Sequence, residues 1–134
     1  GSWTLQGERG WCRVWLTLAP TVPPRVQHLS IASIFPPNAA MQGAFDALLA
    51  ATVAPTQRAI ARLFAAASDR PAQLKQLRTV NLLYGACTLT AILGGDGVQH
   101  TVARVQSAGG ALEVEVTLNP RTGKLTSAEF RVAE

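Results

Sequence analysis

Two segments of this chain carry the same pattern of residues about one hundred positions apart, and this repeat constrains the fold more than any other feature. Both segments alternate apolar and polar residues, which is typical of half-buried β-strands. The identical positions are Gly10, Val14, Thr17, Leu18 and Pro20 in the first segment and Gly110, Val114, Thr117, Leu118 and Pro120 in the second. Beyond the turn the match continues with a shift of one residue, pairing Arg25 with Lys124, Val26 with Leu125 and Ile31 with Phe130.

Both copies also change the phase of their alternation at the same place. Val26 and Leu29 have opposite phase in the first copy, as do Leu125 and Ala128 in the second. One extra residue in each strand, a β-bulge, accounts for such a change. Any two amphipathic hairpins resemble each other to some extent, because strand composition is narrow. The shared turn and the shared change of phase favour a true duplication of architecture.

The spacing of the repeat indicates what the first copy is. One hundred residues accommodate a set of helices and four strands, so the first hairpin corresponds to the end of a domain whose front half is missing. An isolated hairpin is only marginally stable in water, and an edge strand readily pairs with another strand. We therefore expect this hairpin either to extend the edge of the chain's own sheet or to pair with another chain.

Residues 39–83 have a different character from the segments around them, because they are rich in Ala, Leu, Gln and Arg, which favour helices. Apolar residues at helical spacing predict one buried stripe, comprising Phe45, Leu48, Leu49 and Val53. Pro55 either kinks this helix or begins a second one. Ser68 or Asp69 is expected to cap a further helix entered at Pro71.

Four strands are predicted after these helices, at 85–93, 98–106, 111–118 and 124–132, with a glycine-rich turn at 94–97. The predicted fold class is α+β, with helices packed on a curved four-stranded antiparallel sheet and an extra N-terminal β-hairpin. We expect residues 1–38 to form the hairpin segment with a proline-rich linker, and residues 39–134 to form the helices and the meander.

Composition excludes several classes of protein. The chain has 134 residues, of which 48% are apolar and 15% charged, so it can bury a core and is not disordered. The net charge is +4, but the basic residues are dispersed, whereas nucleic-acid-binding proteins usually cluster them. No apolar run approaches the roughly 20 residues of a membrane-spanning helix. Cys12 and Cys87 allow one disulfide at most and are predicted to be buried free thiols. No metal site and no cofactor are predicted.

The helices followed by four strands resemble the cystatin-like superfamily of nuclear transport factor 2 and ketosteroid isomerase. Residues 101–105, 112–118 and 123–130 are similar to small bacterial domains of unknown function. They are also similar to the isomerase-like N-terminal domain of clavulanic-cluster-type, β-lactamase-like serine hydrolases, and residues 14–18 with 23–26 look like the end of such a domain. The resemblance implies a cone-shaped fold with a pocket between sheet and helices, and an extracytoplasmic location.

Catalytic signatures are weak. An isomerase of this superfamily needs an aspartate base with an oxyanion hole of a tyrosine and a protonated acid. The candidates Tyr84, Asp46 and Asp96 all have ordinary structural interpretations, and His28 and His100 are isolated in sequence. If a pocket exists it is apolar, and the residues predicted to line it are Phe45, Leu49, Leu112, Val114 and Val116.

The residues predicted to form a binding surface are Trp11, Arg13, Trp15 and Tyr84. The first three share one face of a strand, and exposed aromatic residues beside arginine mark protein interfaces. The alternative is that this face packs against the helices. We thus expect a non-enzymatic binding or dimerisation module, an accessory region of a larger bacterial protein. Its partner is a second copy or a neighbouring domain, with a small apolar ligand as a further option and neither nucleic acid nor a membrane span. The alternatives are an isomerase- or polyketide-cyclase-like enzyme acting on a small apolar substrate, and a peptide-binding domain that uses a sheet edge.

Overall fold

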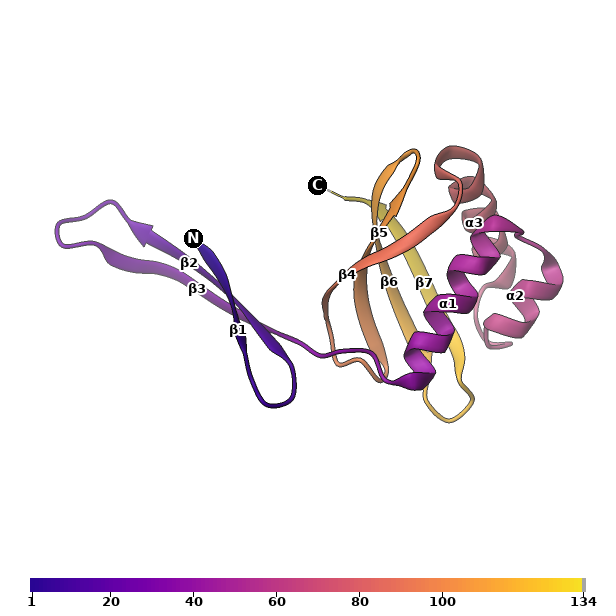
Figure 1. The fold of residues 1–134 in the computed structure, drawn as a ribbon, viewed down its shortest axis with the longest axis horizontal. Helices are drawn as coiled ribbons and strands as arrows, with labels where there is room; N and C mark the ends of the chain where they lie inside the picture. Colours follow the sequence, from indigo (N-terminus) through magenta and orange to yellow (C-terminus); the bar gives the residue numbers. More distant parts are fainter. Residues whose placement is uncertain (134) are drawn as a thin grey trace.

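A computed structural model describes residues 1–133, which form an α+β structure with seven strands and three helices (Figure 1). The strands are β1 (Ser2–Gln6), β2 (Trp11–Ala19), β3 (Arg25–Ile34), β4 (Cys87–Gly95), β5 (His100–Ser107), β6 (Gly110–Asn119) and β7 (Lys124–Val132). The helices are α1 (Ala39–Val53), α2 (Gln57–Leu63) and α3 (Arg70–Tyr84). All strands belong to one open sheet in which spatial order follows chain order.

The sheet consists of two parts that are joined at one point. Strands β1, β2 and β3 form an antiparallel meander that extends away from the rest of the molecule (Figure 1). We call residues 1–34 the arm, and residues 39–133 the helical domain. The two parts meet where β3 pairs with β4 in parallel, through Ile34 and Gly95.

The predicted fold class is wrong in two respects. The strands do not form a separate four-stranded antiparallel cone with an added hairpin, because all seven lie in one open sheet that is mixed through the parallel β3–β4 pairing. The N-terminal segment contributes three strands and not two, since Ser2–Gln6 pairs with β2 along its whole length. The predicted end of the second domain, Glu134, lies outside the described residues.

Polar caps and prolines set the limits of the helices. The Asn38 side chain accepts a hydrogen bond from the Met41 amide at 2.9 Å and so begins α1. Pro55 lies between α1 and α2, so it separates two helices and does not kink one. Of the two predicted caps for the third helix, Asp69 is the one used, and its carboxylate accepts from the Ala72 amide at 3.1 Å.

The core of the molecule lies between the three helices and the inner face of strands β4–β7. Phe45, Leu48 and Leu77 point from the helices into this layer and have no exposed surface. The stripe predicted for the first helix is partly wrong, because Val53 is 58% exposed at the end of α1 and Met41 is buried in its place. The strands contribute to the core Ala103, Val105, Leu112, Val114, Val116, Leu118, Leu125 and Ala128.

The predicted duplication is present in the strand registers. The β2–β3 register shifts between Thr17 and Leu18, and the β6–β7 register shifts between Thr117 and Leu118, which confirms the bulge predicted for both copies. The match includes the strand that the sequence did not predict. Trp3 pairs with Val14 as Ala103 pairs with Val114, and Gln6 pairs with Trp11 as Gln106 pairs with Ala111. The arm therefore repeats β5–β7 residue by residue.

Candidate interaction surface

One face of the arm is apolar and uncovered. We define this apolar face by the residues that share one side of the three paired strands: Trp3, Leu5, Cys12, Val14, Leu16, Leu18, Val26, Leu29 and Ile31. Among the described residues, nine of the fourteen exposed large hydrophobic side chains lie in the arm, and six of those nine belong to this face. Large contiguous apolar patches are rare on monomeric proteins, which makes this face the candidate interaction surface among the described residues.

The centre of the apolar face is Val14. Its cross-strand neighbours are Trp3 on β1 and Ile31 on β3, which shield it to 6% exposure. The surrounding side chains remain open to solvent, with Val26 60% exposed and Ile31 62% exposed. The arm therefore has a partly formed core that lacks a second layer.

In the helical domain, the equivalent positions are covered by the helices. Ala103, Val105, Leu118 and Leu125 are the counterparts of Trp3, Leu5, Leu18 and Val26, and the exposure of each is 2% or less. The sequence pattern is the same in both copies, but only one copy has helices over it (Figure 1). The sequence assigned Leu18 to an inward face, but the structure leaves this side chain 50% exposed.

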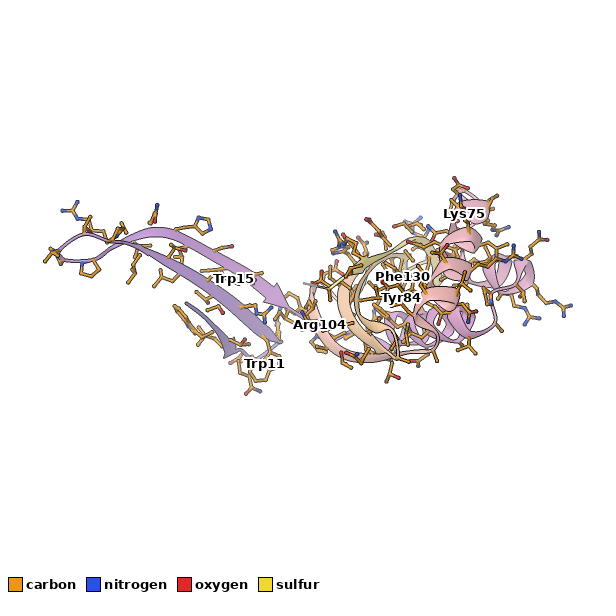
Figure 2. All side chains as sticks on the ribbon, turned by 90° about the horizontal axis from the view of Figure 1, so that it is seen from above. Trp11, Trp15, Lys75, Tyr84, Arg104 and Phe130 are labelled. Atoms are coloured by element: carbon orange, nitrogen blue, oxygen red, sulfur yellow. The ribbon has the colours of Figure 1, made fainter. Side chains whose placement is uncertain are left out.

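The opposite face of the arm carries the predicted interface residues Trp11, Arg13 and Trp15, which alternate with the apolar residues of β2. Figure 2 shows the two tryptophans on the arm. Trp11 is 46% exposed and Trp15 is 37% exposed, and the Arg13 guanidinium lies 5.5 Å from the centre of the Trp15 ring. This distance suits a cation–π interaction. The face does not pack against the helices, so that alternative is wrong; α1, α2 and α3 lie on the far side of strands β4–β7 from the arm (Figure 1).

A cleft of about 660 Å³ lies where the arm meets β4. Trp11 and Arg13 line it from the arm, and Ala91, Ile92 and Leu93 line it from β4. Pro36 and Pro37 complete the wall, which places the cleft at the joint between the two parts. Trp15 does not line the cleft and stands on the open part of the arm.

The residues predicted to line a pocket are distributed between the core and a surface groove. Phe45, Val114 and Val116 have no exposed surface and fill the layer between helices and sheet, while Leu49 packs against it. Leu112 and the predicted interface residue Tyr84 line a groove of about 360 Å³ that α3, β6 and β7 form. Tyr84 and Phe130 both line this groove, which belongs to the helical domain and not to the arm.

The two ion pairs of the described residues share one carboxylate, that of Glu115. Glu115 accepts from His100 Nε2 at 2.8 Å and from Arg131 at 2.6 Å, across the outer faces of β5, β6 and β7. The hydrogen bond from His100 and the charge of Arg131 lower the pKa of Glu115. This arrangement links three neighbouring strands. Asp46 bonds to Gln42 on the surface of α1.

Both cysteines are free thiols. Cys12 is half-buried on β2, and Cys87 is buried at the start of β4, where burial raises the pKa of its thiol. A raised pKa disfavours the reactive thiolate, so Cys87 behaves as a small core residue. Within residues 1–133, no group of three or more His, Cys, Asp and Glu residues is placed to hold a metal ion.

Asp96 organises the turn between β4 and β5. Its Oδ1 accepts hydrogen bonds from the amides of Val98, Gln99 and His100 at 2.8, 2.8 and 3.0 Å. These bonds, above all that from His100, lower the pKa of Asp96 below its ordinary value. The turn adjoins the joint with the arm, because the neighbouring Gly97 carbonyl accepts from the Asn38 amide at 2.9 Å.

The lowered pKa of Asp96 predicts a pH dependence of stability. A carboxyl with a lower pKa in the folded state than in the unfolded state stabilises the fold above the unfolded value, near pH 4, and this contribution is lost as the pH falls through the folded value. Asp96→Asn keeps an acceptor oxygen but does not titrate. We expect the difference in unfolding free energy between the natural protein and this variant to shrink from pH 6 to pH 3, measured by urea unfolding. A difference that stays constant over this range would contradict the prediction.

No helix in the described residues is long and apolar enough to cross a membrane. Comparison with known proteins identifies no relative: no family model, no curated protein and no solved structure matches this chain. Sequence reasoning missed Trp3 and Leu5 because it did not predict β1, although their buried counterparts Ala103 and Val105 were available in the repeat.

Proposed function

We propose that this chain is a non-enzymatic protein-interaction module and that the arm is its docking element. The observation that carries the proposal is the apolar face, where a three-stranded meander exposes the side chains that its duplicate buries. Burial of apolar surface is the main favourable term in protein association. A partner that covers Leu18, Val26 and Ile31 gains that term without any rearrangement of the strands.

The two faces of the arm have different roles in this proposal. The apolar face supplies burial, and the opposite face supplies Trp11, Arg13 and Trp15 at and beside the cleft with β4. Tryptophan and arginine are enriched among residues that dominate binding energy. The apolar face is the primary surface because its side chains are larger in number and are contiguous across all three strands.

A paired set of variants tests the proposal. Leu29→Thr with Ile31→Thr removes two exposed apolar side chains from β3 and keeps residues that suit a strand. The matched control is Leu82→Gln with Leu83→Gln on α3, where the side chains are 83% and 63% exposed and Gln suits a helix. The measurements are the fluorescence of a dye that binds apolar surfaces and solution mass by light scattering over a dilution series.

We expect the natural protein to bind the dye and to self-associate as its concentration rises, because no partner covers the arm. The arm variant should lose most of both signals, and the control should keep them. A natural protein that neither binds the dye nor associates would show that the arm offers no docking surface.

A further inference from the structure

We propose that the apolar face of the arm binds a layer of amphipathic helices, the counterpart of α1–α3, supplied by a separate polypeptide segment. The inference rests on the proposed docking function and names the partner's chemistry. It follows from the duplication, because the arm repeats the strand pairing and the bulge of β5–β7. In β5–β7 the corresponding face is covered by helices α1–α3.

The side chains of the two sheets are suited to the same kind of cover. Leu18 corresponds to Leu118 and Val14 to Val114, without change. Elsewhere the arm has Trp3 for Ala103 and Leu29 for Ala128, but the smaller Cys12 for Leu112 and Ile31 for Phe130. The increases exceed the decreases, so the apolar face of the arm is bulkier than the corresponding face of β5–β7. Because cores tolerate exchanges only when total volume and patterning are kept, we expect the helices over the arm to carry smaller side chains at the contact than α1–α3 do.

The outer edge of the sheet gives a second, independent argument. In the helical domain, Gln76 on α3 bonds to the edge of β7: its Nε2 donates to the Ala128 carbonyl at 2.8 Å, and its Oε1 accepts from the Phe130 amide at 3.0 Å. The equivalent backbone groups on β3 are the Leu29 carbonyl and the Ile31 amide. We therefore expect the partner helix that lies over β3 to carry an amide side chain at the position of Gln76.

The partner helices are not those of a second copy of this chain. Met41, Phe45, Leu48 and Leu77 have no exposed surface, because α1 and α3 already cover strands β4–β7. Among its described residues, each copy has two sets of strands of this kind, the arm and β5–β7, but one helical layer. Transfer of that layer to another arm would uncover as much apolar surface as it covered, so a separate helical segment is the favourable occupant.

The test attaches a helical layer to the arm, with the helices before the strands as in residues 39–132. A second copy of residues 35–100 is placed directly before Gly1, which continues the hundred-residue spacing through the whole protein. A further protein joins a copy of residues 39–84 to Gly1 through a flexible Gly/Ser linker, so that the test does not depend on a second β4. In both proteins the arm and the helical domain stay intact.

The three tryptophans of the chain all lie in the arm and report on its two faces separately. Trp11→Phe with Trp15→Phe leaves Trp3, on the apolar face, as the sole reporter. Trp3→Phe with Trp11→Phe leaves Trp15, on the opposite face, as the matched control. We measure quenching of each by acrylamide in the original and the extended proteins, with helix content by circular dichroism.

We expect the added helices to protect Trp3 from quenching and to leave Trp15 unchanged. Gln76→Leu in the added copy should reduce the protection of Trp3. If Trp3 stays as accessible in both extended proteins as in the original, the proposal is wrong. It is also wrong if Trp3 is already protected in the original chain and the solution mass is that of a dimer, because a second copy is then the occupant. Both of these results contradict the helical partner but not the docking function. The docking function is supported separately if dye binding and self-association still depend on Leu29 and Ile31.

Discussion

Leu118→Ala is expected to lower the unfolding free energy of the helical domain by about 2–5 kcal/mol. Leu118 is 2% exposed beneath the helices, and the shortened side chain leaves a cavity that the packed core fills only partly. The equivalent substitution in the arm, Leu18→Ala, should change stability by only about 0.5 kcal/mol, because Leu18 is 50% exposed. The same residue in the same register thus has a large effect in one copy and a small effect in the other.

Urea unfolding measures both effects within one protein. Since all three tryptophans lie in the arm and all three helices lie in the helical domain, tryptophan fluorescence follows the arm and helical circular dichroism follows the domain. Leu118→Ala should move the transition seen by circular dichroism. A cost for Leu18→Ala as large as that for Leu118→Ala would mean that the apolar face is already covered in the natural chain.

The sequence predicted the elements whose patterns are long or repeated. Strand β7 has the predicted limits, and the bulges at Gln27 and Thr126 could be recognised because two copies changed phase together. Strand β1 was missed because it has five residues, all exposed, and follows no recognisable turn. Gly94 and Gly95 were assigned to a turn on composition, but both belong to β4, and the turn begins at Asp96.

Whether an apolar face is covered cannot be predicted from alternation alone. Alternation assigned Val14, Leu16 and Leu18 to one side of a strand, and the structure agrees, but periodicity carries no information on which element lies over that side. The link between the arm and β4 also could not be predicted from the sequence. It is a single residue pair, Ile34 with Gly95, and one pair leaves no pattern in the sequence. Trp11 and Trp15 are exposed, as residues of an interface must be. Their role in binding stays a proposal.

Gly95→Ala should strongly destabilise the joint between arm and helical domain. Gly95 has φ of +99°, a conformation that costs a residue with a side chain about 1–3 kcal/mol. A Cβ at this position would also overlap the His100 carbonyl oxygen and lie 2.7 Å from Thr101 Cα, so the β4–β5 ladder must shift as well. We expect the unfolding free energy of the helical domain to fall by at least about 2 kcal/mol.

The neighbouring residue provides the control for this substitution. Gly94 lies in the same strand, its backbone does not have positive φ, and a Cβ there would meet no atom within 4 Å, so Gly94→Ala should stay within about 0.5 kcal/mol of the natural protein. Because Gly95 is the partner of Ile34, its substitution should also loosen the arm, which small-angle scattering detects as a broader distribution of interatomic distances. Equal effects of the two alanines on stability and on scattering would show that Gly95 does not hold the joint, and that the arm is positioned by the proline segment before α1.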